Sequence, residues 1–328
     1  MPRKYTGEEL IAQVRDEARI PNTASTGNTD ADILNRINEF VLGYLAPLVM
    51  EVRDEYFIRT TRTPLVASTS KYRIPPRAMF QKLRDIRFKT TTGGYYPLAH
   101  TSMADLDNAR RSLTEVSAPG AFLIEGNYIS LWPPIGASAQ GSLDIAFYFA
   151  PSELVLSTAT AKVAAVDPDT DNPKEVSLES VPATWTDATV LFDAHSSYSG
   201  AETKVWDRKV TNIDIPNKRI VFEDAIDGST FGDFPVEVGD YVALAGDCAL
   251  PGVPRELHPL IGLGAACSVL EDEGDMEILQ AKTGNLNRQL FGGGGRTRGA
   301  IGALENRVEI RPKYIRGGRF LDAQRWWL

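Results

Sequence analysis

The sequence predicts an α+β fold: a helical bundle hub built from N- and C-terminal helices, with inserted antiparallel β regions and an extended C-terminal arm. Three observations predict it. Apolar residues recur at helical spacing near both ends of the 328-residue chain. Between the ends, short alternating runs separated by Gly, Pro, Asn and Asp are typical of strands and turns. The last 37 residues begin with four glycines and combine basic with aromatic side chains.

The first part of the hub, residues 1–55, carries two clear helix starts. Thr6 and Glu9 form a Thr-x-x-Glu capping box, in which each side chain bonds the other residue's backbone amide. Thr29 precedes the acidic Asp30 and Asp32, which favour the positive end of a helix dipole. Apolar residues three and four apart follow each start. We therefore expect two helices joined by a loop.

Two β regions follow. Residues 56–153 read as strands, with a polar helix at 103–113 and a hairpin at 121–132 that turns at Gly126 and Asn127. Residues 154–250 contain short strands with Asp-, Gly- and Pro-rich turns, which suggests an inserted β-sandwich or barrel domain. The pattern leaves these two architectures open.

Helix returns in residues 251–291, the second part of the hub. The stretch 257–270 is apolar nearly all round, which predicts a central, buried helix. Gly274 is a suitable residue to end it, and Asp275 is a suitable N-cap for the next helix. We expect the front and back helices to pack together.

The arm, residues 292–328, differs in charge from the rest of the chain. It holds eight Lys/Arg and three Asp/Glu, a net charge of +5, whereas the whole chain carries −8. Trp and Arg are the residue types that dominate interface energetics. Our interpretation is that Gly292, Gly293, Gly294 and Gly295 form a hinge and that the arm folds onto a partner. The alternative is that it folds back on its own domain.

No reaction is predicted. His100, His195 and His258 lack the spacing of metal ligands or of a catalytic triad. Asp167, Asp169 and Asp171 resemble the start of a calcium loop. However, Asn172 stands where such a loop has Gly and Leu178 where it has Glu, so an acidic turn is favoured. We expect no enzyme activity, no cofactor, no metal and, without a run of 18 uncharged apolar residues, no membrane span.

Three segments resemble the head-to-tail adaptor (connector) proteins of tailed bacteriophages. The first is the front of the chain, which runs from TGEELIAQVRDEARI to the pattern Asp30-x-x-Ile-Leu-x-x-Ile-Asn-Glu39. The second is YRIPPRAMFQKLRDIRF, followed by the GNYISLWPP hairpin, and the third is PRELHPLIGLGAACSVLEDEGD. These motifs specify an architecture and not an active site.

The resemblance implies a structural virion protein in the neck, between capsid and tail, assembled in the bacterial host cytoplasm. It implies a homo-oligomeric ring of 12 copies beneath the portal, with tail or nozzle proteins below. Double-stranded DNA would pass through its channel during genome ejection without sequence-specific binding. The portal-binding residues would lie in the arm: Arg316, Arg319, Phe320, Arg325, Trp326, Trp327 and Leu328.

Two other functions remain open at this point. One is a β-rich tail or fibre module that recognises glycan or another tail protein, with Trp185, Tyr198 and Trp206 available for stacking on sugars. The other is a cell-wall hydrolase, which needs an acid and a nucleophile in one cleft. The sequence shows no such pair.

Overall fold

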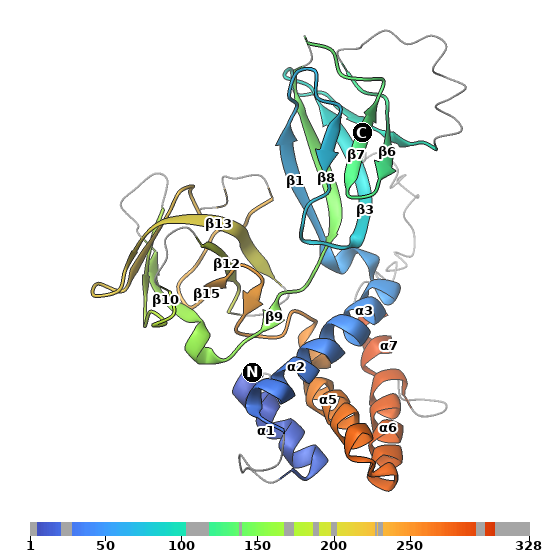
Figure 1. Cartoon of the computed structure of the whole chain (residues 1–328), viewed down its shortest axis with the longest axis vertical. Helices are drawn as coiled ribbons and strands as arrows, with labels where there is room; N and C mark the ends of the chain where they lie inside the picture. Colours follow the sequence, from blue (N-terminus) through green and yellow to red (C-terminus); the bar gives the residue numbers. More distant parts are fainter. Residues whose placement is uncertain are drawn as a thin grey trace, which may run out of the picture.

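A computed structural model describes residues 5–20, 28–102, 118–137, 140–166, 174–185, 190–197, 202–226, 228, 232–292 and 299–305. It is a mixed α+β structure with few helices and many strands, so the predicted fold class is confirmed at that level. Figure 1 shows helices at one end of the molecule, two sheets at the other and a small barrel beside them.

The helices from both ends of the sequence share one hydrophobic core, and we call them the helical cluster. They are α1 (Gly7–Ala18), α2 (Asp30–Phe40), a π-helical turn (Val41–Leu45), α3 (Ala46–Val52), α5 (His258–Glu273), α6 (Met276–Phe291) and α7 (Ala300–Glu305). Both predicted N-caps are present: Thr6 and Thr29 each form a capping box. Helix α5 contacts α1, α2 and α6, which makes it the centre of the cluster.

Two four-stranded sheets pack face to face over a second core. Their strand orders are β1-β8-β3-β4 and β2-β7-β6-β5. The strands are β1 (Ile58–Pro64), β2 (Lys71–Arg73), β3 (Ala78–Lys89), β4 (Tyr95–Pro97), β5 (Ala99–His100), β6 (Ala121–Glu125), β7 (Tyr128–Trp132) and β8 (Ser142–Phe149). The predicted hairpin turn lies between β6 and β7, where Gly126 has a positive φ of 57°.

The second β region closes into a barrel with its own core, which decides between the two predicted architectures. Its order is β10-β11-β14-β13-β12-β15. Those strands are β10 (Ala161–Val166), β11 (Glu175–Leu178), β12 (Leu191–His195), β13 (Thr203–Asp214), β14 (Arg219–Phe222) and β15 (Tyr241–Leu244). A two-stranded sheet, β9 (Glu153–Leu154) with β16 (Asp247–Cys248), joins the chain entering the barrel to the chain leaving it.

Two expectations need correction. The β regions are not purely antiparallel, because β5–β6 and β9–β16 are parallel pairs. In each pair the strands are joined by a long excursion of the chain, which is the connection that parallel pairing requires. The arm is also not extended from its start. Ile301 and Leu304 of α7 are buried in the helical core. This part of the arm therefore folds back on its own domain, which was the alternative to binding a partner.

Candidate functional site

The predicted portal-binding residues, Arg316 to Leu328, lie outside the described residues. So do three of the four hinge glycines, Gly293 to Gly295, the three aspartates of the candidate calcium turn and the predicted polar helix 103–113. Gly292 is described and ends α6 with a positive φ of 88°. The site that can be built from contacts is therefore a different one, the junction where the barrel, the sheets and the helical cluster meet.

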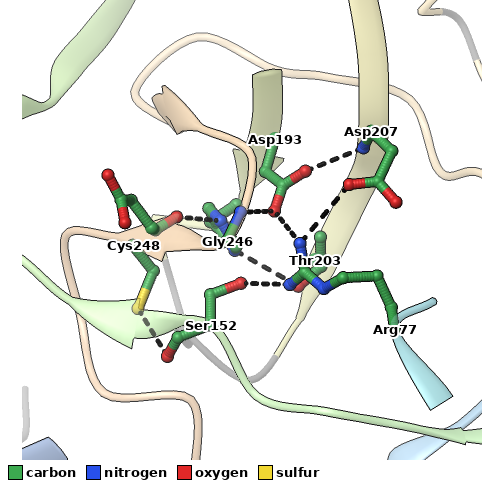
Figure 2. Close-up of polar contacts among 9 residues, drawn as sticks. Arg77, Ser152, Asp193, Thr203, Asp207, Gly246 and Cys248 are labelled. Atoms are coloured by element: carbon green, nitrogen blue, oxygen red, sulfur yellow. Dashed lines mark hydrogen bonds and ion pairs between the residues drawn. The ribbon is translucent and has the colours of Figure 1, made fainter. Parts of the chain in front are cut away.

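Arg77 is the centre of this junction. It follows Pro75 and Pro76, which carry the chain from β2 to the start of β3. Its guanidinium Nη1 lies 2.8 Å from Oδ2 of Asp193 in the barrel, and its Nη2 donates to Oγ of Ser152 at 2.8 Å. Figure 2 shows the guanidinium between these groups and Asp207. The flat face lies over the ring of Phe149, 4.7 Å from the centroid, so one side chain contacts both the sheets and the barrel.

Asp193 is fully buried, and its charge is compensated from three directions. Besides Arg77, it accepts hydrogen bonds from the backbone amides of Asp207 and Gly246. A buried carboxylate without such partners would be costly, so this set of donors fixes the relative positions of β12, β13 and the β15–β16 turn.

The barrel also packs directly on the β1–β8 sheet. Trp206 of β13 contacts Phe149 edge to face, with ring centroids 5.8 Å apart. Arg59 of β1 donates to the carbonyl of Thr203 and lies over the ring of Phe234. A Cβ added at Gly232 would lie 2.3 Å from the carbonyl oxygen of Thr60, so only glycine permits this close approach. Aromatic, cationic and backbone contacts thus hold the barrel in one orientation.

The helical cluster joins the junction through β9. The side-chain amide of Asn38 in α2 donates to the carbonyl of Leu154 and accepts from its amide, as a neighbouring strand would. Glu8 of α1 accepts hydrogen bonds from the amide and hydroxyl of Ser157. Burial raises the pKa of Glu8, but the bonds from Ser157 outweigh it and the net pKa is lowered. Asn38 belongs to the Ile-Asn-Glu pattern of the sequence. Its hydrogen bonds to Leu154 show what the asparagine of that pattern does: it joins α2 to β9.

The three histidines do not gather into a site. His195 and His258 are buried, each with Nε2 at a backbone carbonyl oxygen. Burial lowers the pKa of both, that of His258 to about 4, which favours the neutral ring. Among the described residues, no three Asp, Glu, His or Cys side chains are placed to hold a metal ion. Within those same ranges no helix has the length and apolar character of a membrane span.

A comparison with protein families gives one match, the SU10 adaptor protein family, over residues 5–209. This is more than half of the 328-residue chain. The chain belongs to the SU10 adaptor protein family. It is a phage structural adaptor and, as such, a virion component. A comparison with curated proteins gives no match.

The matched range places Asn38, Arg77, Ser152, Asp193 and Asp207 of this adaptor inside the family region. It ends within β13, so α5, α6 and the arm lie beyond it. Sequence reasoning missed Arg77 and Asp193 as a pair. The only local signal was the Pro75-Pro76-Arg77 run, which does not indicate a partner 116 residues away.

Proposed function

We propose that this adaptor forms a ring beneath the capsid portal, joins head to tail and continues the channel through which double-stranded DNA passes. The observation that carries the proposal is the adaptor family match over residues 5–209, which include the front helices, both sheets and part of the barrel. A ring of identical subunits needs two different complementary faces on each copy. Subunits can repeat such faces accurately only if their parts are held rigidly, and the Arg77 junction supplies that rigidity.

In this proposal the helical cluster is the hub, and the arm is the portal-binding element. Helix α7 is anchored in the hub core next to α3 and α6, so the chain beyond residue 305 starts from a fixed point. That remaining stretch is basic and ends on two tryptophans. Arg316, Arg319 and Arg325 pair with acidic groups of the portal, while Phe320, Trp326 and Trp327 fill apolar pockets. Because α7 is anchored, any swing of this stretch starts after residue 305 and not at Gly292 to Gly295.

The rest of the chain is acidic, which suits a DNA channel. Residues 1–291 carry −13, and an acidic lining repels phosphate, so DNA does not adhere as it passes. The polar outer face of α6, with Glu277 and Arg288, is a candidate for the contact between neighbouring copies. The barrel faces outward, toward tail or nozzle proteins, and the assembled ring occupies the neck of the virion.

The alternative function, a glycan-binding tail or fibre module, loses support from the aromatic side chains. Trp185 is 2% exposed and packs on Phe192 in the barrel core, where it cannot stack on a sugar. Trp206 packs on Phe149. Tyr198 lies outside the described residues.

Deleting residues 319–328 tests the portal-binding role of the arm. Truncating an interface hot spot costs about 2 kcal/mol or more, roughly thirtyfold in affinity. The deletion removes several such residues, so we expect portal binding to be lost in co-sedimentation while the circular dichroism spectrum is unchanged. As a control, the full-length variant Asp322→Asn should bind the portal normally. Unchanged portal affinity of the truncated protein would show that the arm is not the docking element.

A further inference from the structure

Four carboxylates gather around the base of the barrel. Asp247 of β16 and Glu153 of β9 are register partners in the parallel pair. Asp193 and Asp207 lie on the other side of the junction, around Arg77. Among the residues that the structure describes, the cations near these carboxylates are Arg77 and the largely buried Arg59, so the carboxylates outnumber them. The cluster sits where the chain enters and leaves the barrel.

Charged and titratable side chains approach Asp247 from each element that packs against it. Glu153 approaches from β9, Asp193 and His195 from β12, and Arg77 from the start of β3. His195 supplies no compensating charge, because burial lowers its pKa and its Nε2 lies 2.9 Å from the backbone oxygen of Asp247. Burial, followed by the like charges of Glu153 and Asp193, raises the pKa of Asp247 to about 6.

We propose that the β9–β16 pair is a pH-operated latch that fastens the base of the barrel to the helical cluster. When Asp247 takes up a proton, the cost of its buried charge and the repulsion from its register partner Glu153 end, and the short parallel ladder closes. When the proton leaves, the ladder opens more often. The latch acts on a ladder with two backbone hydrogen bonds, Glu153 amide to Gly246 carbonyl and Val155 amide to Cys248 carbonyl. Opening the ladder also breaks the two hydrogen bonds between Asn38 and Leu154, so the open state is a local fluctuation whose population hydrogen exchange reports.

The direction of the effect follows from the binding of the proton. Asp247 binds a proton more tightly in the closed latch than in the open one, where its pKa approaches the ordinary 3.8. The closed state therefore gains stability as pH falls from about 6 toward 3.8, and above about 6 the burial cost and repulsion of the ionised Asp247 act fully. This inference concerns the local opening of the β9–β16 ladder and does not rest on the proposed ring.

Hydrogen exchange of the full chain, followed by mass spectrometry on peptides that cover residues 150–157, tests the latch directly. After correction for intrinsic exchange, we expect the protection of this segment to rise roughly three- to tenfold between pH 7.5 and 5.5. The Gly120 amide, which donates to Trp132 in the distant sheet, should keep its protection. In Asp247→Asn the segment should be at least as protected at pH 7.5 as the wild type is at pH 5.5, because the amide is uncharged at both pH values.

A matched control and a second variant complete the test. Asp16→Asn removes a carboxylate from the exposed face of α1 and should leave the pH response of the 150–157 segment intact. Glu153→Gln, at an exposed position, should move the pH response of the segment to lower pH because one repelling charge is gone. This variant replaces Asp247→Asn in the test if Asp247→Asn does not fold. Protection of the segment that does not change with pH in the wild type would overturn the latch. So would an unchanged pH response in Asp247→Asn or Glu153→Gln.

Discussion

Replacing Arg77 with methionine is the sharpest perturbation of the junction, because it removes one charge of a buried pair and keeps an apolar stem over Phe149. Asp193 is fully buried and would lose its only cation within hydrogen-bonding distance among the described residues. Breaking a buried ion pair from one side typically costs 3–5 kcal/mol. Asp193 keeps the amides of Asp207 and Gly246, so we expect the lower end, about 3 kcal/mol.

Urea unfolding measured by tryptophan fluorescence provides the assay, because Trp185 lies in the barrel core. Arg77→Met should shift the midpoint to lower urea. The double variant Arg77→Met/Asp193→Asn, which removes both charges, should recover part of the loss. Arg84→Met is the control: Arg84 pairs with Asp54 and Glu55 at the surface, where water screens the charges, so its loss should leave the urea midpoint nearly unchanged. A free energy of unfolding for Arg77→Met within about 0.5 kcal/mol of the wild type would refute the role given to the junction.

Two further predictions concern the helical cluster and the barrel. Gly264→Ala in α5 should destabilise the protein by about 1–3 kcal/mol in thermal melts, because its Cβ would lie 2.1 Å from the ring of Phe40. Gly284→Ala in α6, which meets nothing within 4 Å, should instead stabilise by about 0.5–1 kcal/mol. Replacing residues 162–241 with a short Gly/Ser linker should leave the helical circular dichroism signal intact, because Ala161 and Val242 are register partners and the barrel has its own core. A lost helical signal would mean that the cluster needs the barrel to fold.

Local features of the fold were predictable from the sequence, because the residues that determine them are close together. The capping boxes at Thr6 and Thr29, the αL residue Gly274 and the N-cap Asp275 act within four residues of the helix ends they define. The 126–127 turn is similarly local. That the chain is a phage adaptor was also predictable, since the first two motifs that suggested it lie within the matched residues 5–209.

Features that depend on distant residues were not predictable. Closure of the barrel requires β10 to pair with β15, about 80 residues later, which no strand pattern reveals. The pairing of Arg77 with Asp193 depends on how two separately formed β units dock. Helix α7 was read as part of an extended arm because its six residues, AIGALE, contain a glycine and are too short to show a period.

The central claim is that this adaptor forms a ring on its portal. Electron microscopy of the purified protein mixed with the portal of its own phage tests this claim most directly. The account predicts a ring of adaptor copies stacked coaxially on the portal, with the open channel continuous between them and the barrels on the outside. An adaptor that stays unattached to the portal, or that is found instead on fibres or host glycan, would contradict it.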